Sequence, residues 1–113
     1  MRSDPTSKSP VVVLVTWPAD RDPVPLARAL VEERLAACVN VLPEMRSFYA
    51  WQGAIHDDAE RQLIIKTTAD RAVALEARVR DVHPYDMPEF LVLRIEQGNE
   101  AYLGWLRDST RPL

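Results

Sequence analysis

The spacing of apolar residues changes several times along the chain, and each change marks a predicted element. Residues 11–17 read VVVLVTW, a β-branched apolar run closed by Pro18, which is typical of a strand buried on both faces. Asp20 and Asp22 offer helix caps, and Pro23 suits a first helical position. The apolar stripe that follows predicts a helix of about fourteen residues. Its members are Leu26, Ala27, Leu30, Val31 and Leu35.

The middle of the chain alternates with a period of two. From Cys38 to Thr68 this pattern predicts two long strands joined as a hairpin, with the turn near Gly53. Pro43 interrupts the first of them, which predicts a bulge or an edge position because proline cannot donate to a strand ladder.

The last third contains a helix, a strand and a short helix. Asp70 is expected to cap the first helix and Pro84 to end it. The segment EFLVLRIE, from Glu89 to Glu96, reads as a strand, and Asn99 as the cap of the final helix. The apolar positions of the two helices are Ala72, Leu75, Val79 and Val82, then Tyr102, Leu103, Trp105 and Leu106.

This order of elements is that of an α+β, ferredoxin-like βαββαβ sandwich with a long central hairpin and a short C-terminal helix. Both long helices then cover one face of the sheet, and the other face should be polar in a monomer. In the last strand, however, Phe90 and Val92 alternate with Leu91 and Leu93, so both faces are apolar. We expect other copies of the chain to cover the second face.

Composition narrows the function classes. The chain has 113 residues with 14 Lys plus Arg against 17 Asp plus Glu, a net charge of -3, which argues against nucleic-acid binding through phosphate neutralisation. The single Cys38 excludes an internal disulfide and a multi-cysteine zinc site, and fits a cytoplasmic setting. No apolar run is long enough to span a membrane. Residues 1–10 are polar and are expected to be a disordered leader, with the domain spanning residues 11–113.

Reactive side chains are densest in the segment HPYDMPE. His83, Tyr85, Asp86 and Glu89 lie within seven positions there, and prolines restrict the backbone. A histidine beside carboxylates can act as a general base or bind a divalent ion. The structural alternative is a histidine that satisfies carbonyls at a helix end. The sequence leaves both interpretations open.

Other candidates lie on the predicted strands. Cys38 stands where the first helix gives way to a strand, and a lone free cysteine there is most often a small buried residue. Tyr49 and Trp51 project together toward a cleft or an interface. Lys66 stands in an apolar strand on the same side as Glu60, and either pairs with it across a subunit boundary or reaches solvent. The segment around His56, with Asp57 and Asp58, is either a surface metal site or a solvated turn.

Enzyme motifs are absent from the sequence. With only three glycines it has no phosphate-binding loop, and it contains neither HExxH nor GxSxG. An enzymatic interpretation would need His83 as base, oriented by Glu89, in a cleft closed by Tyr85 and Trp105. A third hypothesis is a scaffold that meets a protein partner through the hairpin tip, residues 53–60. We favour a non-enzymatic binding protein.

Five stretches in order, RLAACVNVLP, SFYAWQG, LIIKTT, HPYDMPE and GNEAYLGWL, resemble the CutA family of divalent-cation tolerance proteins. The resemblance implies a ferredoxin-like subunit in a tight homotrimer, with hairpin strands pairing between subunits, and a role in tolerance to copper and other divalent ions. The architecture is also similar to trimeric PII signal proteins, whose clefts between subunits hold small ligands.

The resemblance implies a site for a divalent cation, with copper first, or for a small ligand between subunits. The expected metal ligands are His83, Cys38 and Glu89, and the expected ligand contacts are Tyr49, Trp51, Glu60, Lys66, Tyr85 and Trp105. Some copper-binding members have a cysteine and a second histidine where this chain has Val15 and Val82.

Overall fold

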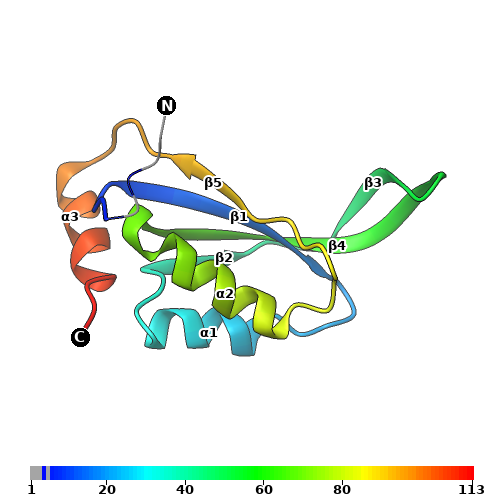
Figure 1. Ribbon diagram of the computed structural model, residues 1–113, viewed down its shortest axis with the longest axis horizontal. Coiled ribbons are helices and arrows are strands. Elements are labelled where there is room, and N and C mark those ends of the chain that lie inside the picture. The colour runs from blue at the N-terminus through cyan, green and yellow to red at the C-terminus, as the bar shows by residue number, and fades with distance from the viewer. Residues whose placement is uncertain (1–3, 5) are drawn as a thin grey trace.

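An antiparallel sheet forms the centre of the molecule, as a computed structural model that describes residues 4 and 6–113 shows (Figure 1). Among those residues there are five strands and three α-helices. In chain order they are β1 (Pro10–Pro18), α1 (Val24–Glu32), β2 (Cys38–Val41), β3 (Met45–Trp51), β4 (Ala54–Thr68), the 3-10 turn η1 (Ala69–Arg71), α2 (Ala72–Val82), β5 (Leu91–Arg94) and α3 (Glu100–Ser109). The predicted ferredoxin-like sandwich is confirmed.

The sheet runs in the order β2, β4, β1, β5, and β3 continues alongside the far part of β4. The β1–β4 ladder extends from the pair Pro10 and Thr68 to the pair Pro18 and Glu60. Helices α1 and α2 cover one face of this sheet, and the core lies between the two layers (Figure 1). Its buried members include Val11, Val13, Val15, Trp17, Leu63 and Ile65 from the strands, and Leu26, Leu30, Leu75 and Val79 from the helices.

The predicted hairpin is present, and Pro43 divides its first strand as expected. Residues 42–44 separate β2 from β3, and both strands pair with β4. Gln52 and Gly53 have φ angles of 49° and 79°, so the tip is a two-residue turn of the kind that matches strand twist. The β3–β4 hairpin extends beyond the body of the sandwich (Figure 1).

Two elements are shorter than predicted. Helix α1 has 9 residues because Arg34 adopts a left-handed φ of 61°, and the amides of Leu35 and Ala36 both donate to the Leu30 carbonyl. Leu35 is still buried, which explains why it matched the helical stripe. Strand β5 has only 4 residues, since it pairs with β1 from Val11 to Leu14 and the preceding residues belong to a loop.

The start of α2 also differs from the prediction. Asp70 lies in η1 and does not cap α2; its carboxylate accepts hydrogen bonds from Lys8 Nζ and Thr68 Oγ1, each at 2.5 Å. The carbonyls of Ser7 and Ser9 accept from the amides of Asp70 and Ala69. The predicted leader therefore has hydrogen-bonded residues at its C-terminal end, while positions 1–3 and 5 lie outside the described residues.

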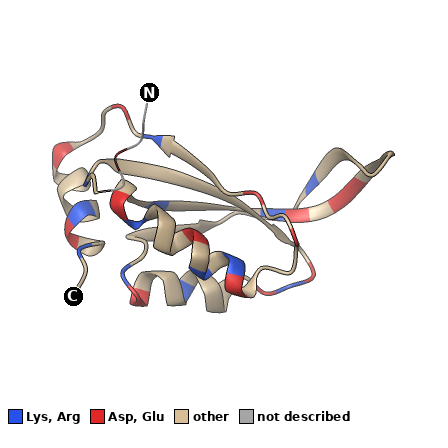
Figure 2. Cartoon of the chain, in the orientation of Figure 1, with Lys and Arg blue, Asp and Glu red and all other residues tan. Residues whose placement is uncertain are grey.

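The second face of the sheet has an apolar centre, as the strand pattern predicts, with Lys66 and Glu60 toward its two ends. Register places Leu91 beside Leu14 and Leu93 beside Val12, and Ile64 flanks Leu14 on the other side. Leu91 and Leu93 are 51% and 50% exposed in the single chain. Figure 2 shows β1 free of charged residues along its length. We call Val12, Leu14, Ile64, Leu91 and Leu93 the open-face patch.

The hydrogen bonds around Asp70 lead to a stability prediction. Burial by itself raises the pKa of Asp70, but the bonds from Lys8 and Thr68 outweigh it and hold that pKa below its usual value. The stabilisation is therefore complete above the unfolded pKa of about 4 and is lost as pH falls through the folded pKa. Asp70→Asn should lower the free energy of unfolding by about 1 kcal/mol at pH 7.

Urea unfolding of both proteins from pH 7 to pH 3 measures this difference. It should shrink toward zero at the acid end of the range. A difference that is constant with pH would contradict the assignment of the effect to the Asp70 carboxylate.

Candidate functional site

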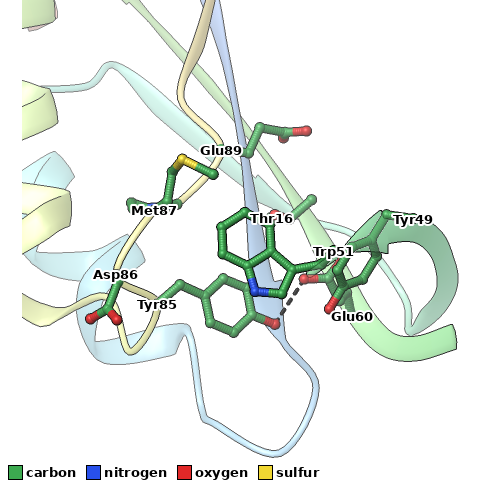
Figure 3. A pocket seen from close by; sticks show the side chains of 9 residues that line it. Thr16, Tyr49, Trp51, Glu60, Tyr85, Asp86, Met87 and Glu89 are labelled. Atoms are coloured by element: carbon green, nitrogen blue, oxygen red, sulfur yellow. Dashed lines mark hydrogen bonds between the residues drawn. The ribbon is translucent and has the colours of Figure 1, made fainter. Parts of the chain in front are cut away.

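A pocket of about 520 Å³ opens between the β3–β4 hairpin and the loop that joins α2 to β5. Figure 3 shows its side chains entering from both sides, with the Tyr85 hydroxyl pointing toward Glu60. The residues that line the pocket are Thr16, Tyr49, Trp51, Glu60, Tyr85, Asp86, Met87, Pro88 and Glu89. We call this the hairpin pocket.

His83 fixes the loop that forms one wall of the pocket. Helix α2 ends at Val82, and His83 is extended, as expected of a residue before proline. Its ring lies edge-on to Trp17, with centroids 4.9 Å apart. Nε2 lies 2.7 Å from the Thr16 carbonyl oxygen, and Nδ1 lies 3.1 Å from the Tyr85 amide nitrogen. A backbone N–H only donates and a carbonyl only accepts, so Nε2 carries the proton and Nδ1 accepts.

This geometry favours the structural interpretation of His83. Both ring nitrogens are engaged with the backbone, and the residue is only 9% exposed. A metal bond or a proton transfer at either nitrogen would require one of these hydrogen bonds to break. His83 therefore positions Tyr85 and does not face the pocket as a base or a ligand.

Tyr85 and Glu60 form the polar floor of the pocket. The Tyr85 hydroxyl donates to Glu60 Oε2 at 2.8 Å, and Glu60 is 6% exposed. Burial, the hydrogen bond to Glu60 and the Glu60 charge together raise the pKa of the Tyr85 hydroxyl far above its ordinary value. Tyr85 is thus a neutral donor at physiological pH.

Glu89 is held at the pocket by a hydrogen bond from the Gln62 side chain. The Gln62 amide nitrogen donates to Glu89 Oε2 at 3.1 Å and to the Val15 carbonyl at 3.0 Å. Gln62 stands opposite Thr16 in the β1–β4 ladder. The sheet register therefore fixes Gln62, which in turn holds the Glu89 carboxylate at the wall of the pocket.

The hairpin supplies the aromatic wall. Strand β3 places Tyr49 and Trp51 on the same face as Glu60, since Met45 pairs with Glu60 and side chains alternate. The Tyr49 hydroxyl donates to Asp58, and this bond, burial and the nearby acidic charges raise the pKa of Tyr49. The Tyr49 ring stacks on His56 at 5.2 Å, and Trp51 remains 44% exposed.

Three predicted site residues lie elsewhere. Lys66 is six residues from Glu60 along β4, about 20 Å in a strand, so the two cannot pair within one chain. The Lys66 ammonium instead lies 5.9 Å from the centre of the Tyr102 ring, and Trp105 packs near the same tyrosine at 5.4 Å. Cys38 pairs with Lys66 in the sheet, which places it at that same distant end.

The three predicted metal ligands, His83, Cys38 and Glu89, are not gathered. No group of three or more His, Cys, Asp or Glu side chains suited to a metal occurs in the part of the chain that the structure describes. The alternative cluster at His56 is also dispersed, because Asp57 pairs with Arg46 and Asp58 with Tyr49.

Sequence reasoning missed several residues of the pocket. Thr16 and Met87 carry no charged group that would mark them in the sequence, and Gln62, which does not itself line the pocket, holds Glu89 at its wall. The register that places Thr16 opposite Gln62 was not derivable from local spacing. The density of the HPYDMPE segment was the useful signal, because four of its residues besides Tyr85 line the pocket.

Comparison with known proteins identifies the family. Residues 11–109 match the model described as CutA1 divalent ion tolerance protein. The chain belongs to this family. The divalent-cation tolerance protein CutA of Thermus thermophilus is 48% identical over 99 residues, which cover 88% of this chain and 96% of that protein. The crystal structure of CutA1 from Oryza sativa has a TM-score of 0.88 and 44% identity, covering 94% of this chain and 97% of the other.

The human protein CutA is 47% identical over 96 residues, which cover 85% of this chain. The match spans 54% of the human protein, so the chain corresponds to about half of that relative.

In the described part of the chain, no helix is sufficiently long and apolar to cross a membrane.

Val15 and Val82, the two positions that the resemblance singles out, lie in different environments. Val15 is completely buried in the core beneath the helices, whereas Val82 is the exposed last residue of α2. Neither lines the hairpin pocket.

The raised pKa of Tyr85 gives a spectroscopic prediction. Its stabilising effect is complete below the unfolded pKa of about 10 and is lost as pH rises toward the folded value. In the folded protein, absorbance at 295 nm should show tyrosine ionisation well above pH 10, and Tyr85→Phe should remove its highest-pH component. If Tyr85→Phe instead removed a titration step near the ordinary tyrosine pKa of about 10, the Tyr85–Glu60 geometry would be contradicted. Tyr102→Phe is the control, since Tyr102 lies at the other end of the sheet.

Proposed function

We propose that the chain is a non-enzymatic, homotrimeric binding protein that serves divalent-cation tolerance, and that the hairpin pocket is its ligand site. The observation that carries the proposal is the uniform negative charge of one cavity, which Glu60, Asp86 and Glu89 line. Within the described part of one chain they do not form a three-ligand metal group, so an ion there needs water or groups from a neighbour as further ligands. Carboxylate oxygens attract and coordinate divalent cations. The family membership supports a role in tolerance, and the engagement of both His83 nitrogens supports binding rather than catalysis.

Assembly is part of this proposal. The open-face patch is apolar surface that a second copy of the chain can cover, and Phe48 and Ile55 expose further apolar surface on the opposite face of the β3–β4 hairpin. A head-to-tail contact between copies can close into a ring, and the resemblance to the CutA family implies a ring of three. Each hairpin pocket then faces a neighbouring subunit, which can supply further ligands to an ion.

Copper is the ion to test first, together with Mn²⁺ as a harder cation. Copper favours imidazole and thiolate, whereas oxygen donors suit Mn²⁺. Since the pocket offers carboxylates, we expect Glu60 and Glu89, with water or groups from a neighbour, to hold the ion. We expect neither His83 nor Cys38 to provide a ligand atom to the ion.

The cytoplasmic location remains part of the proposal. It is supported by the single cysteine, which fits a reducing compartment. A relative from Archaeoglobus fulgidus is named periplasmic and one from Arabidopsis thaliana chloroplastic, so members of the family occupy more than one compartment.

The assembly is tested by a charge placed in the open-face patch. Leu93→Glu should convert the trimer to monomers at micromolar concentration, because a carboxylate in an apolar interface loses its hydration. Analytical ultracentrifugation measures the masses. Val73→Glu is the matched control, since Val73 is 75% exposed on α2 and should leave the trimer intact. A monomeric wild-type chain would contradict the proposal.

Ion binding is tested by calorimetric titration of Cu²⁺ and Mn²⁺. Glu89→Gln and Glu60→Gln should each weaken binding by about tenfold or more, because each removes a charged ligand. Cys38→Ser, at the distant end of the sheet, should leave the affinity within about twofold, once circular dichroism shows that the variant is folded. Full affinity in Glu89→Gln, or loss of binding in Cys38→Ser, would overturn the assignment of the site.

A further inference from the structure

The walls of the hairpin pocket contain more than an ion needs. A hydrated metal ion requires oxygen, nitrogen or sulfur donors at short distance. Tyr49, Trp51 and Tyr85 present aromatic rings to the same cavity, and Met87 adds a thioether chain. These groups form an apolar lining, and a site that held only a metal ion would not require one.

The charge of the pocket has one sign. Three of its lining residues are carboxylates, and none of the described residues that line it is basic. Glu60 is more than nine-tenths buried, so its charge acts in a medium where water screens it weakly. The pocket therefore attracts positive charge and disfavours anions.

Both carboxylates retain acceptor capacity. Tyr85 donates to Oε2 of Glu60, and Gln62 donates to Oε2 of Glu89. A carboxylate has about four acceptor positions, so each can take a further donor from a ligand. The hydrogen bonds from Tyr85 and Gln62 hold the two groups in place before a ligand arrives.

The size of the cavity distinguishes a molecule from an ion. Its volume of about 520 Å³ lies within the range of pockets that hold small organic ligands. A positive charge carried on carbon-substituted nitrogen satisfies both features of the wall at once. Its charge faces the carboxylates and the electron-rich ring faces, while its alkyl groups contact the apolar surface.

We propose that the hairpin pocket binds a small organic cation, an alkylated ammonium, between the aromatic rings of the hairpin and the carboxylates Glu60 and Glu89. The inference rests on the proposed function only in taking this pocket as the ligand site. Trp51 supplies the principal ring, because tryptophan has the strongest attraction for a cation and this one lines the cavity while remaining 44% exposed.

The test compares a cation with a neutral molecule of similar shape. Tetramethylammonium and tert-butanol are titrated into the full chain, with binding followed by calorimetry and by tryptophan fluorescence. Tetramethylammonium should bind at least about tenfold more tightly than tert-butanol. Equal affinities would overturn the proposal, since the two probes are similar in size and only tetramethylammonium carries a charge.

Variants locate the binding. Trp51→Leu should weaken tetramethylammonium binding by about tenfold, and Trp51→Phe should weaken it less because a ring remains. Glu89→Gln should weaken it by several-fold and reduce its salt dependence. Trp105→Phe is the control, because Trp105 lies outside the pocket beside Tyr102 and should leave the affinity unchanged. Full affinity in Trp51→Leu would overturn the proposal.

Divalent-ion titrations on the same variants keep the two proposals distinguishable. Metal binding that depends on Glu89, without any binding of tetramethylammonium, would overturn the organic-cation inference and leave the proposed function intact. Tetramethylammonium binding that depends on Trp51, without a Glu89-dependent metal site, would support the inference and overturn the metal assignment.

Discussion

The antiparallel pairing of β1 with β4 is the constraint on which the other features depend. It runs over the whole length of β1 and places residues about 50 positions apart in direct contact. On one face this ladder supplies the centre of the core beneath α1 and α2. On the other it carries the open-face patch and, at its far end, sets Thr16 opposite Gln62 and Pro18 opposite Glu60. A slip of one residue would exchange the two faces and remove both the core and the pocket.

The pocket forms beside the last residues of β1, where β5 no longer pairs with that strand. Strand β5 pairs with β1 only as far as Leu14, so the last part of β1 has a free edge. There the His83 Nε2–H donates to the Thr16 carbonyl, and Nδ1 accepts from the Tyr85 amide. The loop is thereby held against the sheet, with Tyr85 directed at Glu60 (Figure 3). A residue that resembles a catalytic or metal-binding histidine acts as a structural connection between strand and loop.

The pocket and the open-face patch lie on the same side of the sheet, so the proposed ligand site and the proposed assembly share one surface. Strand alternation places Glu60, Gln62, Ile64 and Lys66 on the face opposite the helices. A partner that covers Leu91 and Leu93 will also approach the mouth of the pocket. Occupancy of the pocket and stability of the assembly are therefore expected to depend on each other.

Local spacing was enough to predict the order of elements, the break at Pro43, the Asn99 cap and the apolar second face, because each follows from contacts between near neighbours in the chain. Five of the candidate site residues, Tyr49, Trp51, Glu60, Tyr85 and Glu89, also line the pocket. Lys66 and Trp105 do not line it. Lys66 lies far along β4 from Glu60, beside helix α3, and local spacing does not indicate which end of the sheet that helix packs against. The partners of His83, Asp70 and Gln62 likewise depended on register and on which edge of β1 remained free. Those are properties of contacts between distant segments, and only the folded chain specifies them.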